Sequence, residues 1–193
     1  MAYKLKQNGG SFRITDSIDD EMGIIPVSTV TAKHVQLGPF RVTTLTLDNV
    51  AQAVVNGTEY QGTKIFTFPE GRINVLGVTA TLKQKTTSAL ASTLNASSTG
   101  AIGLGTATAS NVSLTSTMVD LLPTTAFTSS ATINVAGTAV SAALAASAQF
   151  DGTGTAKPVY LNTAYATTSD VDADATQTIS GTIVISYVFL GDY

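Results

Sequence analysis

The stretch TISGTIVISYVFLGD, residues 178–192, decides the fold of this chain. One face of a strand formed by it would carry Ile179, Ile183, Ile185, Tyr187 and Phe189. A period of two built from β-branched and aromatic residues is typical of a strand. The alternate face also becomes apolar near its end. We therefore expect this strand inside a sheet, with its partner strands supplied by earlier parts of the chain.

Shorter β signals precede this stretch and are separated by turn residues. We predict strands at residues 27–31, 40–47, 50–55, 60–68, 72–82, 101–109, 131–140 and 157–166. Asn56-Gly57 predicts a tight hairpin between two of them, and Gly77 predicts a bulge or a close backbone approach. Short strands at nearly regular spacing indicate an all-β fold, an antiparallel β-sandwich or jelly roll. We assign residues 26–193 to this single domain.

Residues 1–25 differ from the rest because their hydrophobic periodicity is weak. They combine Lys4, Lys6 and Arg13 with an acidic run at residues 16–21. One interpretation is a solvated arm or a loosely attached first strand. The other is an extended N-terminal arm that reaches a neighbouring subunit and becomes ordered on contact. The sequence leaves both interpretations open.

Composition excludes several classes of function. The chain has 193 residues and no cysteine, which excludes disulfides, thiolate metal sites and cysteine nucleophiles. It shows no signal-peptide pattern and no apolar run near the roughly 20 residues that span a bilayer, so we expect a soluble protein without a membrane partner. Residues 1–85 hold nine Lys/Arg and seven acids, a net +2, and residues 86–193 hold one Lys and six acids, a net −5. Without a basic cluster, nucleic acid is not an expected partner.

Metal-binding signals are weak. His34 is the single histidine, so a histidine-based metal site or catalytic triad would depend on it alone, and we expect a surface or strand histidine. Asp170, Asp172 and Asp174 are carboxylates at alternate positions, which could converge on calcium. The calcium-loop pattern also needs Gly at its sixth and Glu at its twelfth position, where this chain has Ala175 and Gly181. The alternative is an acidic, solvated loop, and we predict no cofactor.

Catalytic signals are equally sparse. Glycoside hydrolysis needs two carboxylates about 5–10 Å apart in a rigid cleft, whereas most acids here lie in turns or acidic runs. Asp120 is the one acid in an apolar setting, between Val119 and Leu121. We expect it to be a partly buried, hydrogen-bonded structural residue. The chain has no tryptophan to form a sugar platform. We therefore predict no enzymatic activity and no catalytic residue.

Several stretches taken together resemble a family of small structural proteins from tailed bacteriophages. They are Phe68-Pro-Glu-Gly-Arg-Ile-Asn-Val-Leu-Gly77, Gly103-Leu-Gly-Thr106, Val119-Asp-Leu-Leu-Pro123, Phe150-Asp-Gly-Thr-Gly154, Val159-Tyr-Leu-Asn162 and the terminal Ser180-Gly-Thr-Ile-Val-Ile with Leu190-Gly-Asp-Tyr193. The likeness covers roughly residues 60–193, and the order of the stretches is more specific than any one of them. Proteins that look like this are virion components, and some are head decoration or cement proteins.

The resemblance implies a homotrimer on the capsid exterior, assembled in the host cytoplasm and bound to the major capsid protein. Avidity over many symmetric sites would offset modest contacts per subunit. We hypothesise that Lys4, Lys6 and Arg13 of the arm contact the shell. The alternative function is a head-fibre or tail module that binds a host surface glycan. A groove lined with several aromatic residues would favour that alternative.

Overall fold

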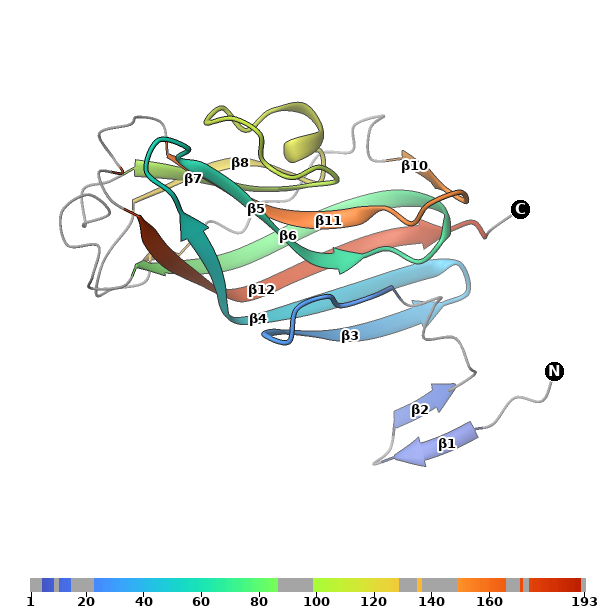
Figure 1. Ribbon diagram of the computed structural model, residues 1–193. Helices are drawn as coiled ribbons and strands as arrows, with labels where there is room; N and C mark the ends of the chain where they lie inside the picture. The colour runs from blue at the N-terminus through green and yellow to red at the C-terminus, as the bar shows by residue number, and fades with distance from the viewer. Residues whose placement is uncertain are drawn as a thin grey trace.

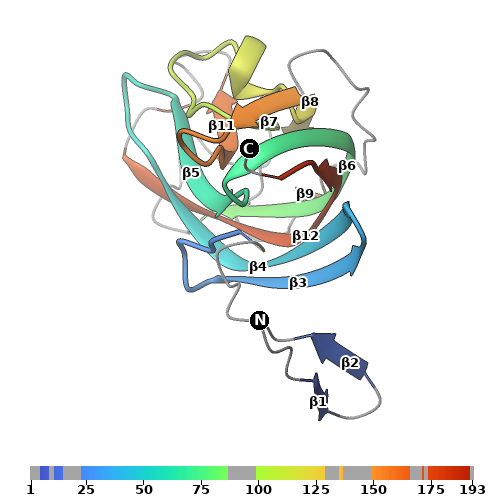
Figure 2. The same ribbon diagram turned by 90° about the vertical axis from the view of Figure 1, so that its right-hand side faces the viewer.

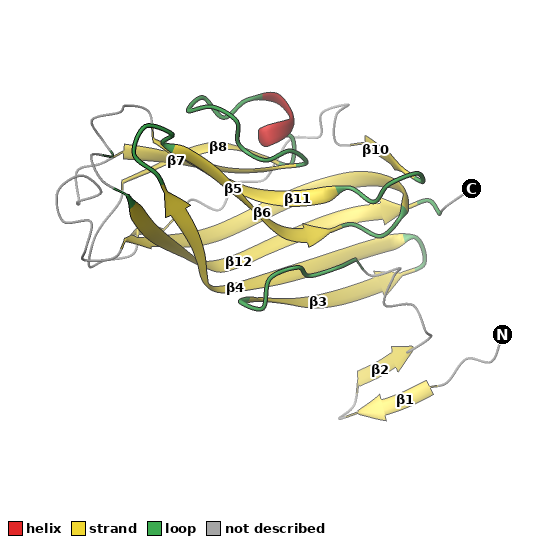
Figure 3. Ribbon diagram, viewed as in Figure 1, coloured by secondary structure: helices red, strands yellow, loops and turns green. Residues whose placement is uncertain are grey.

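Two antiparallel sheets pack against each other in the structure, a computed structural model, and confirm the predicted all-β sandwich (Figure 1). The structure describes residues 5–8, 11–14, 23–86, 99–128, 135–136, 149–165, 171 and 174–191. Viewed from its end, the sandwich shows the two sheets as stacked layers (Figure 2). Strands dominate the described part, and its one helical element is a short 3-10 helix, η1 at Ser116–Met118 (Figure 3).

The larger sheet has the strand order β10-β6-β12-β4-β3, and the short β9 pairs with β6. Its strands are β3 Val30–Leu37, β4 Phe40–Val54, β6 Gly71–Thr86, β9 Val135–Ala136, β10 Gln149–Gly152 and β12 Ala175–Phe189. The smaller sheet has the order β5-β11-β7-β8. Its strands are β5 Tyr60–Thr67, β7 Thr99–Gly105, β8 Leu122–Thr128 and β11 Pro158–Tyr165.

The C-terminal strand β12 lies inside the larger sheet, as its sequence predicts. It pairs with β4 on one side and with β6 on the other. Ile179, Ile183 and Ile185 are 0% exposed and Tyr187 is 1% exposed, so the predicted face is the one that packs on the second sheet. Each buried aliphatic side chain of this kind contributes about 1.5–3 kcal/mol to folding. The strand on which the sequence argument rests is therefore the central strand of the core.

The predicted strands at 40–47 and 50–55 are one strand, β4. Asn49, between them, adopts a positive φ of 53°, and its backbone N–H donates to Ser180 Oγ at 3.0 Å. The ladder between β4 and β12 shifts its register at this point. The polar interruption in the sequence is therefore a bulge within a continuous strand, and the prediction of two strands is wrong.

The predicted hairpin around Asn56-Gly57 is also wrong. Strand β5 does not return beside β4 but pairs with β11 in the other sheet. The connecting residues 55–59 include two positive φ angles, 85° at Gly57 and 50° at Glu59, and the Glu59 carbonyl accepts the Tyr165 N–H at 2.8 Å. A two-residue turn would keep both strands in one sheet, whereas this longer turn carries the chain across the sandwich.

Two other turn and bulge signals are confirmed. Strand β3, Val30–Leu37, shares only residues 30–31 with the predicted strand at 27–31, so those bounds are wrong. It meets β4 through Gly38-Pro39, where Gly38 has a φ of 59°. Glycine at the first central position is typical of a type II′ hairpin turn. In β6 the ladder to β12 pairs Val75 with Tyr187 and Gly77 with Ser186. Leu76 is therefore the extra residue of a bulge at the place that Gly77 marks.

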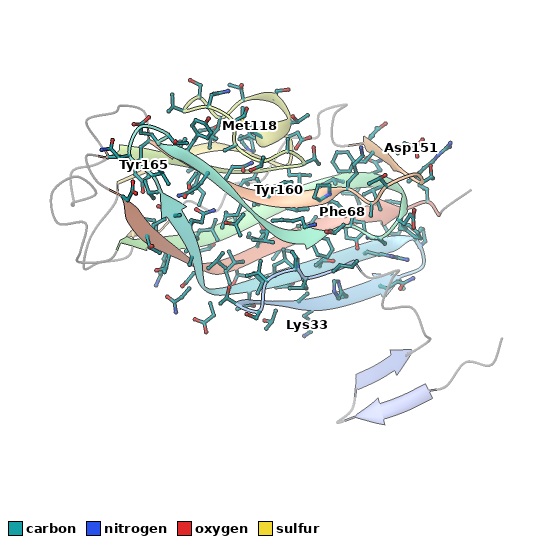
Figure 4. The ribbon with its side chains drawn as sticks, in the orientation of Figure 1. Lys33, Phe68, Met118, Asp151, Tyr160 and Tyr165 are labelled. Atoms are coloured by element: carbon teal, nitrogen blue, oxygen red, sulfur yellow. The ribbon has the colours of Figure 1, made fainter. Side chains whose placement is uncertain are left out.

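The interior between the sheets has two chemically different halves. The aromatic half contains Phe66, Phe68, Phe150 and Tyr187, and the Phe68 ring centroid lies 5.2 Å from that of Tyr187. The polar half contains Gln52, Gln84, Thr163, Tyr165 and Gln177, all buried. Figure 4 shows Phe68 between the sheets and Tyr165 toward the opposite end. Because Gln177 and Tyr187 are ten residues apart on β12, the halves are separated by about 33 Å of strand.

The N-terminal segment contains a separate two-stranded hairpin, β1 Leu5–Asn8 and β2 Ser11–Ile14. These strands pair with each other and with no strand of the sandwich, and Figures 1 and 2 draw the hairpin apart from it. Ile24 is already tied to the body, because it exchanges backbone hydrogen bonds with Thr67 at 2.9 and 2.8 Å. A Gly9-Gly10 link of two residues is a hairpin signal, which our interpretation of an arm did not use.

Candidate functional site

An exposed apolar patch lies on the outer face of the larger sheet, where β3 and β4 meet. We define the apolar patch as Val35, Leu37 and Phe40, which are 56%, 79% and 53% exposed. Leu37 pairs directly with Phe40, and Val35 pairs with the half-buried Val42. Phe40 also pairs with the half-buried Val188 of β12. Single exposed apolar residues are ordinary, but a contiguous group on one face marks an interaction surface.

The apolar patch lies on a sheet edge. Strand β3 is the last strand in the order of the larger sheet, so its side away from β4 has no ladder partner among the described strands. Exposed edge strands are usually protected by charges, proline or bulges. In β3 the only Lys, Arg, Asp or Glu is Lys33, which points away from the sheets in Figure 4. This edge therefore carries one protecting charge, and the rest of it is available for pairing with another chain.

The predicted shell-contact residues divide between described and undescribed parts. Lys6 of β1 stands directly opposite Arg13 of β2 in the hairpin register. Opposite residues of an antiparallel pair share a face, so the two basic residues belong to the same face of the hairpin. Lys4 lies outside the described residues. The structure thus brings two of the three predicted residues together without testing their role.

The acidic loop is described only at its end. Asp174 is exposed, and its Oδ1 accepts the Asn56 backbone N–H at 3.0 Å, which ties the start of β12 to the turn after β4. Asp170 and Asp172 lie outside the described residues. Among the residues that the structure describes, no three His, Cys, Asp or Glu side chains form a group that could hold a metal. The calcium site stays a prediction.

His34 lies on the inner face of β3, as a strand histidine. Its Nδ1 is 2.9 Å from Thr43 Oγ1, and its ring centroid is 6.2 Å from that of Phe66. Burial lowers the pKa of His34, and the charge of nearby Arg41 lowers it further. Arg41 is buried and stacks on the Phe189 ring at 4.1 Å. These contacts keep His34 neutral at physiological pH and give it a packing role.

Asp120 is partly buried and hydrogen-bonded, as expected for a structural residue. It accepts the Thr106 backbone N–H at 2.8 Å and the Thr106 hydroxyl at 2.7 Å. Burial raises the pKa of Asp120, and the hydrogen bonds from Thr106 oppose that shift. The side chain closes the loop between β7 and β8. No second carboxylate enters these contacts, and they give Asp120 a structural role.

The stretches that carry the phage resemblance meet one another inside the fold. Phe68 contacts Phe150, with ring centroids 5.8 Å apart, and Gly71 pairs with Gly152 between β6 and β10. Asn162 pairs with Gly103, and Leu161 pairs with Leu104, in the ladder between β11 and β7. Where these contacts are described, the stretches therefore take part in the packing and strand pairing of the sandwich.

The polar half of the interior is a connected hydrogen-bond network that sequence reasoning missed. Gln177 is its centre: its Nε2 donates to Thr163 Oγ1 at 2.7 Å and to Gln52 Oε1 at 3.0 Å. Its Oε1 accepts Tyr165 Oη at 2.7 Å and Gln84 Nε2 at 3.2 Å. The sequence signal that could have predicted this network is a glutamine at an inward position of β4, β6 and β12. Gln52, for example, alternates with the inward Val50 and Val54. The network links the two sheets without forming a reactive site.

Comparison with known proteins adds no relative, because no protein family, curated protein or solved structure matches this chain. Within the described ranges, no helix is long and apolar enough to cross a membrane. The strongest feature of the candidate site is the apolar patch on the open edge of the larger sheet.

Proposed function

We propose that this protein is a structural component of a tailed-phage virion that decorates and stabilises the capsid by symmetric subunit contacts. The observation that carries the proposal is the apolar patch beside the open β3 edge. A surface of this kind is suited to being covered by protein. The resemblance of residues 60–193 supplies the virion context. The partners would be copies of the chain, as a homotrimer, and the major capsid protein.

The internal construction supports a mechanical role. The described core joins its two sheets through an aromatic half and a hydrogen-bonded polar half, so both ends of the sandwich are fixed. Gln177 uses both its amide nitrogen and its amide oxygen in this network, whereas Gln84 Oε1 is buried without a hydrogen-bond partner. Connected buried hydrogen bonds of this kind make a core rigid. A subunit that clamps a shell needs this stiffness more than it needs a reactive group. Its attachment energy would come from many repeated contacts.

The glycan-binding alternative has less support. A sugar groove is usually lined by several aromatic side chains. Among the residues whose side chains the structure describes, Phe40 is the one exposed aromatic. Phe40 also lies on an open sheet face with aliphatic neighbours, which suits a protein partner better than a sugar.

The proposal is tested by mixing the full chain with shells assembled from the major capsid protein of the same virus. Native mass measurement is expected to give a trimer, and sedimentation is expected to show saturable binding to shells. Leu37→Ser should reduce shell binding or trimer formation at least tenfold. Val55→Ser is the matched control, because Val55 is 45% exposed and lies away from the apolar patch. A monomer that ignores shells would overturn the proposal.

A further inference from the structure

The N-terminal hairpin has no strand partner beyond its own two strands in the part of the chain that the structure describes. Strands β1 and β2 form a two-stranded sheet of four residues each and pair with no other described strand. An isolated two-stranded hairpin is marginally stable at best in water, and a third strand or a packing surface is needed. The hairpin is therefore an element whose stabilising contacts must come from elsewhere.

The register makes this hairpin two-faced. Leu5 pairs with Ile14, and Gln7 pairs with Phe12, whereas Lys6 pairs with Arg13. Opposite and alternate residues share a face of a sheet. Leu5, Phe12 and Ile14 therefore belong to one face, and Lys6 and Arg13 belong to the other. The first face is apolar apart from Gln7, so burying it would be favourable.

The sandwich offers a matching surface. The apolar patch of Val35, Leu37 and Phe40 stays exposed in the single chain, and it adjoins the open edge of β3. A free hairpin can lie with its apolar face on such a patch, which removes the apolar side chains of both surfaces from water. The hairpin and the patch thus each have an apolar face that an apolar partner would cover.

We propose that the hairpin of one copy, residues 5–14, docks with its apolar face on the apolar patch of a second copy. A second copy is favoured because hairpin and patch are both present in the single chain and the patch is still exposed. The eight residues 15–22 can span up to about 26–29 Å, which is enough to reach a neighbouring subunit. Lys6 and Arg13 would face outward, where the proposed shell contact requires positive charge.

The expected contact is apolar on both sides. Each docked hairpin brings three large apolar side chains onto Val35, Leu37 and Phe40, which are 56%, 79% and 53% exposed before docking. A closed oligomer repeats this contact at every subunit, so modest single contacts add up. This exchange of hairpins between copies would be the subunit contact that the proposed function needs. It does not depend on the presence of a capsid.

Engineered cysteines test the exchange in the full chain, which has none of its own. Phe12→Cys and Leu37→Cys variants, each with a different tag, are purified separately, mixed and mildly oxidised. We expect a disulfide between the two differently tagged chains. Lys6→Cys mixed with Leu37→Cys is the matched control, because Lys6 belongs to the other face, and it should give at least fivefold less product. Equal yields in both mixtures would overturn the proposal.

A double variant separates docking in trans from docking on the same chain. This variant carries Phe12→Cys and Leu37→Cys in one chain. If it forms a disulfide only within that chain, and the two single variants form none between chains, the proposal that the hairpin docks on a second copy is wrong. In an independent test, the double substitution Phe12→Asp with Ile14→Asp should raise the dissociation constant of the oligomer at least tenfold. The unfolding curve of the monomer should stay unchanged. Cross-linking in trans without binding to shells would defeat the capsid function and leave the exchange standing. Binding to shells without cross-linking in trans would overturn the exchange and leave the capsid function standing.

Discussion

The two halves of the sandwich interior are equally buried but are held together by different forces. In the aromatic half, Phe68 packs edge-on against Tyr187 and close to Phe66 and Phe150. In the polar half, Gln177 connects Gln52, Thr163, Tyr165 and Gln84 by hydrogen bonds. The first half gains stability from removing apolar surface from water. The second gains little net stability but is strongly penalised if one member is lost.

This difference indicates a division of labour between stability and specificity. An aromatic cluster can adjust to small shifts of one sheet over the other, because its contacts are not directional. The glutamine network can be satisfied in only one relative position of the sheets, since each hydrogen bond has a narrow geometry. The polar half therefore fixes the alignment of the sheets, while the aromatic half, together with the aliphatic core beside it, gains free energy from burial.

The largest expected effect breaks the aromatic half. Phe68→Ala removes a ring that is 1% exposed and touches three other rings. The lost burial and the cavity should lower the free energy of unfolding by about 3–5 kcal/mol, measured by urea denaturation. Phe68→Leu is the control and should cost clearly less. Equal losses for both variants would show that ring packing is unimportant there.

The next effect breaks the polar half. Gln177→Met keeps the volume but leaves Gln52, Thr163, Tyr165 and Gln84 without a common partner, at a cost of about 2–4 kcal/mol. Tyr165→Phe removes one hydroxyl and should cost about 1–2 kcal/mol. A double-mutant cycle between these variants should show coupling of at least about 0.5 kcal/mol. Strict additivity would mean that the network does not act as a unit.

A smaller effect is a pH dependence of folding stability that comes from the aromatic half and not from the polar half. His34 borders the aromatic half, while the polar half contains only amides, a threonine and a tyrosine. Because the pKa of His34 is lowered in the folded state, the unfolded chain takes up the proton first as pH falls. Stability is fully present above the ordinary pKa of about 6.5 and decreases below it. Solvent screens this half-buried group, so the effect should stay under about 1 kcal/mol.

The measurement is the thermal midpoint between pH 7.5 and 5. His34→Gln should flatten this dependence relative to the unchanged protein, because Gln does not titrate. Gln36→Glu on the same strand is a useful counter-control that adds a titrating group at an exposed position. If the two midpoint curves of the unchanged protein and His34→Gln run parallel, the assignment of the pH dependence to His34 is wrong.

The smallest effect on stability is expected outside both halves. Phe40→Ser changes a residue that is 53% exposed on the apolar patch, so the free energy of unfolding of the monomer should stay within about 0.5 kcal/mol. The same variant should weaken self-association strongly if the patch is an interface. A large loss of monomer stability would show that Phe40 contributes to the stability of the fold and not only to a binding surface.

The sequence by itself determined the strand character of residues 178–192, their inward face and their place inside a sheet. It also determined the turn at Gly38-Pro39 and the bulge near Gly77. These features depend on alternation and on local backbone preferences, which neighbouring residues settle among themselves. The prediction that Asp120 is partly buried and hydrogen-bonded is confirmed for a similar reason, since its apolar neighbours were visible in the sequence.

Only the tertiary structure decided which sheet each strand joins, as the wrong hairpin at Asn56-Gly57 shows. It also brought Gln52, Gln84 and Gln177 together from three strands and left Val35, Leu37 and Phe40 uncovered. Such outcomes depend on contacts between residues far apart in the chain, with Gln52 and Gln177 separated by 125 positions. Periodicity records which side of a strand faces inward, but it carries no information about which strand lies opposite.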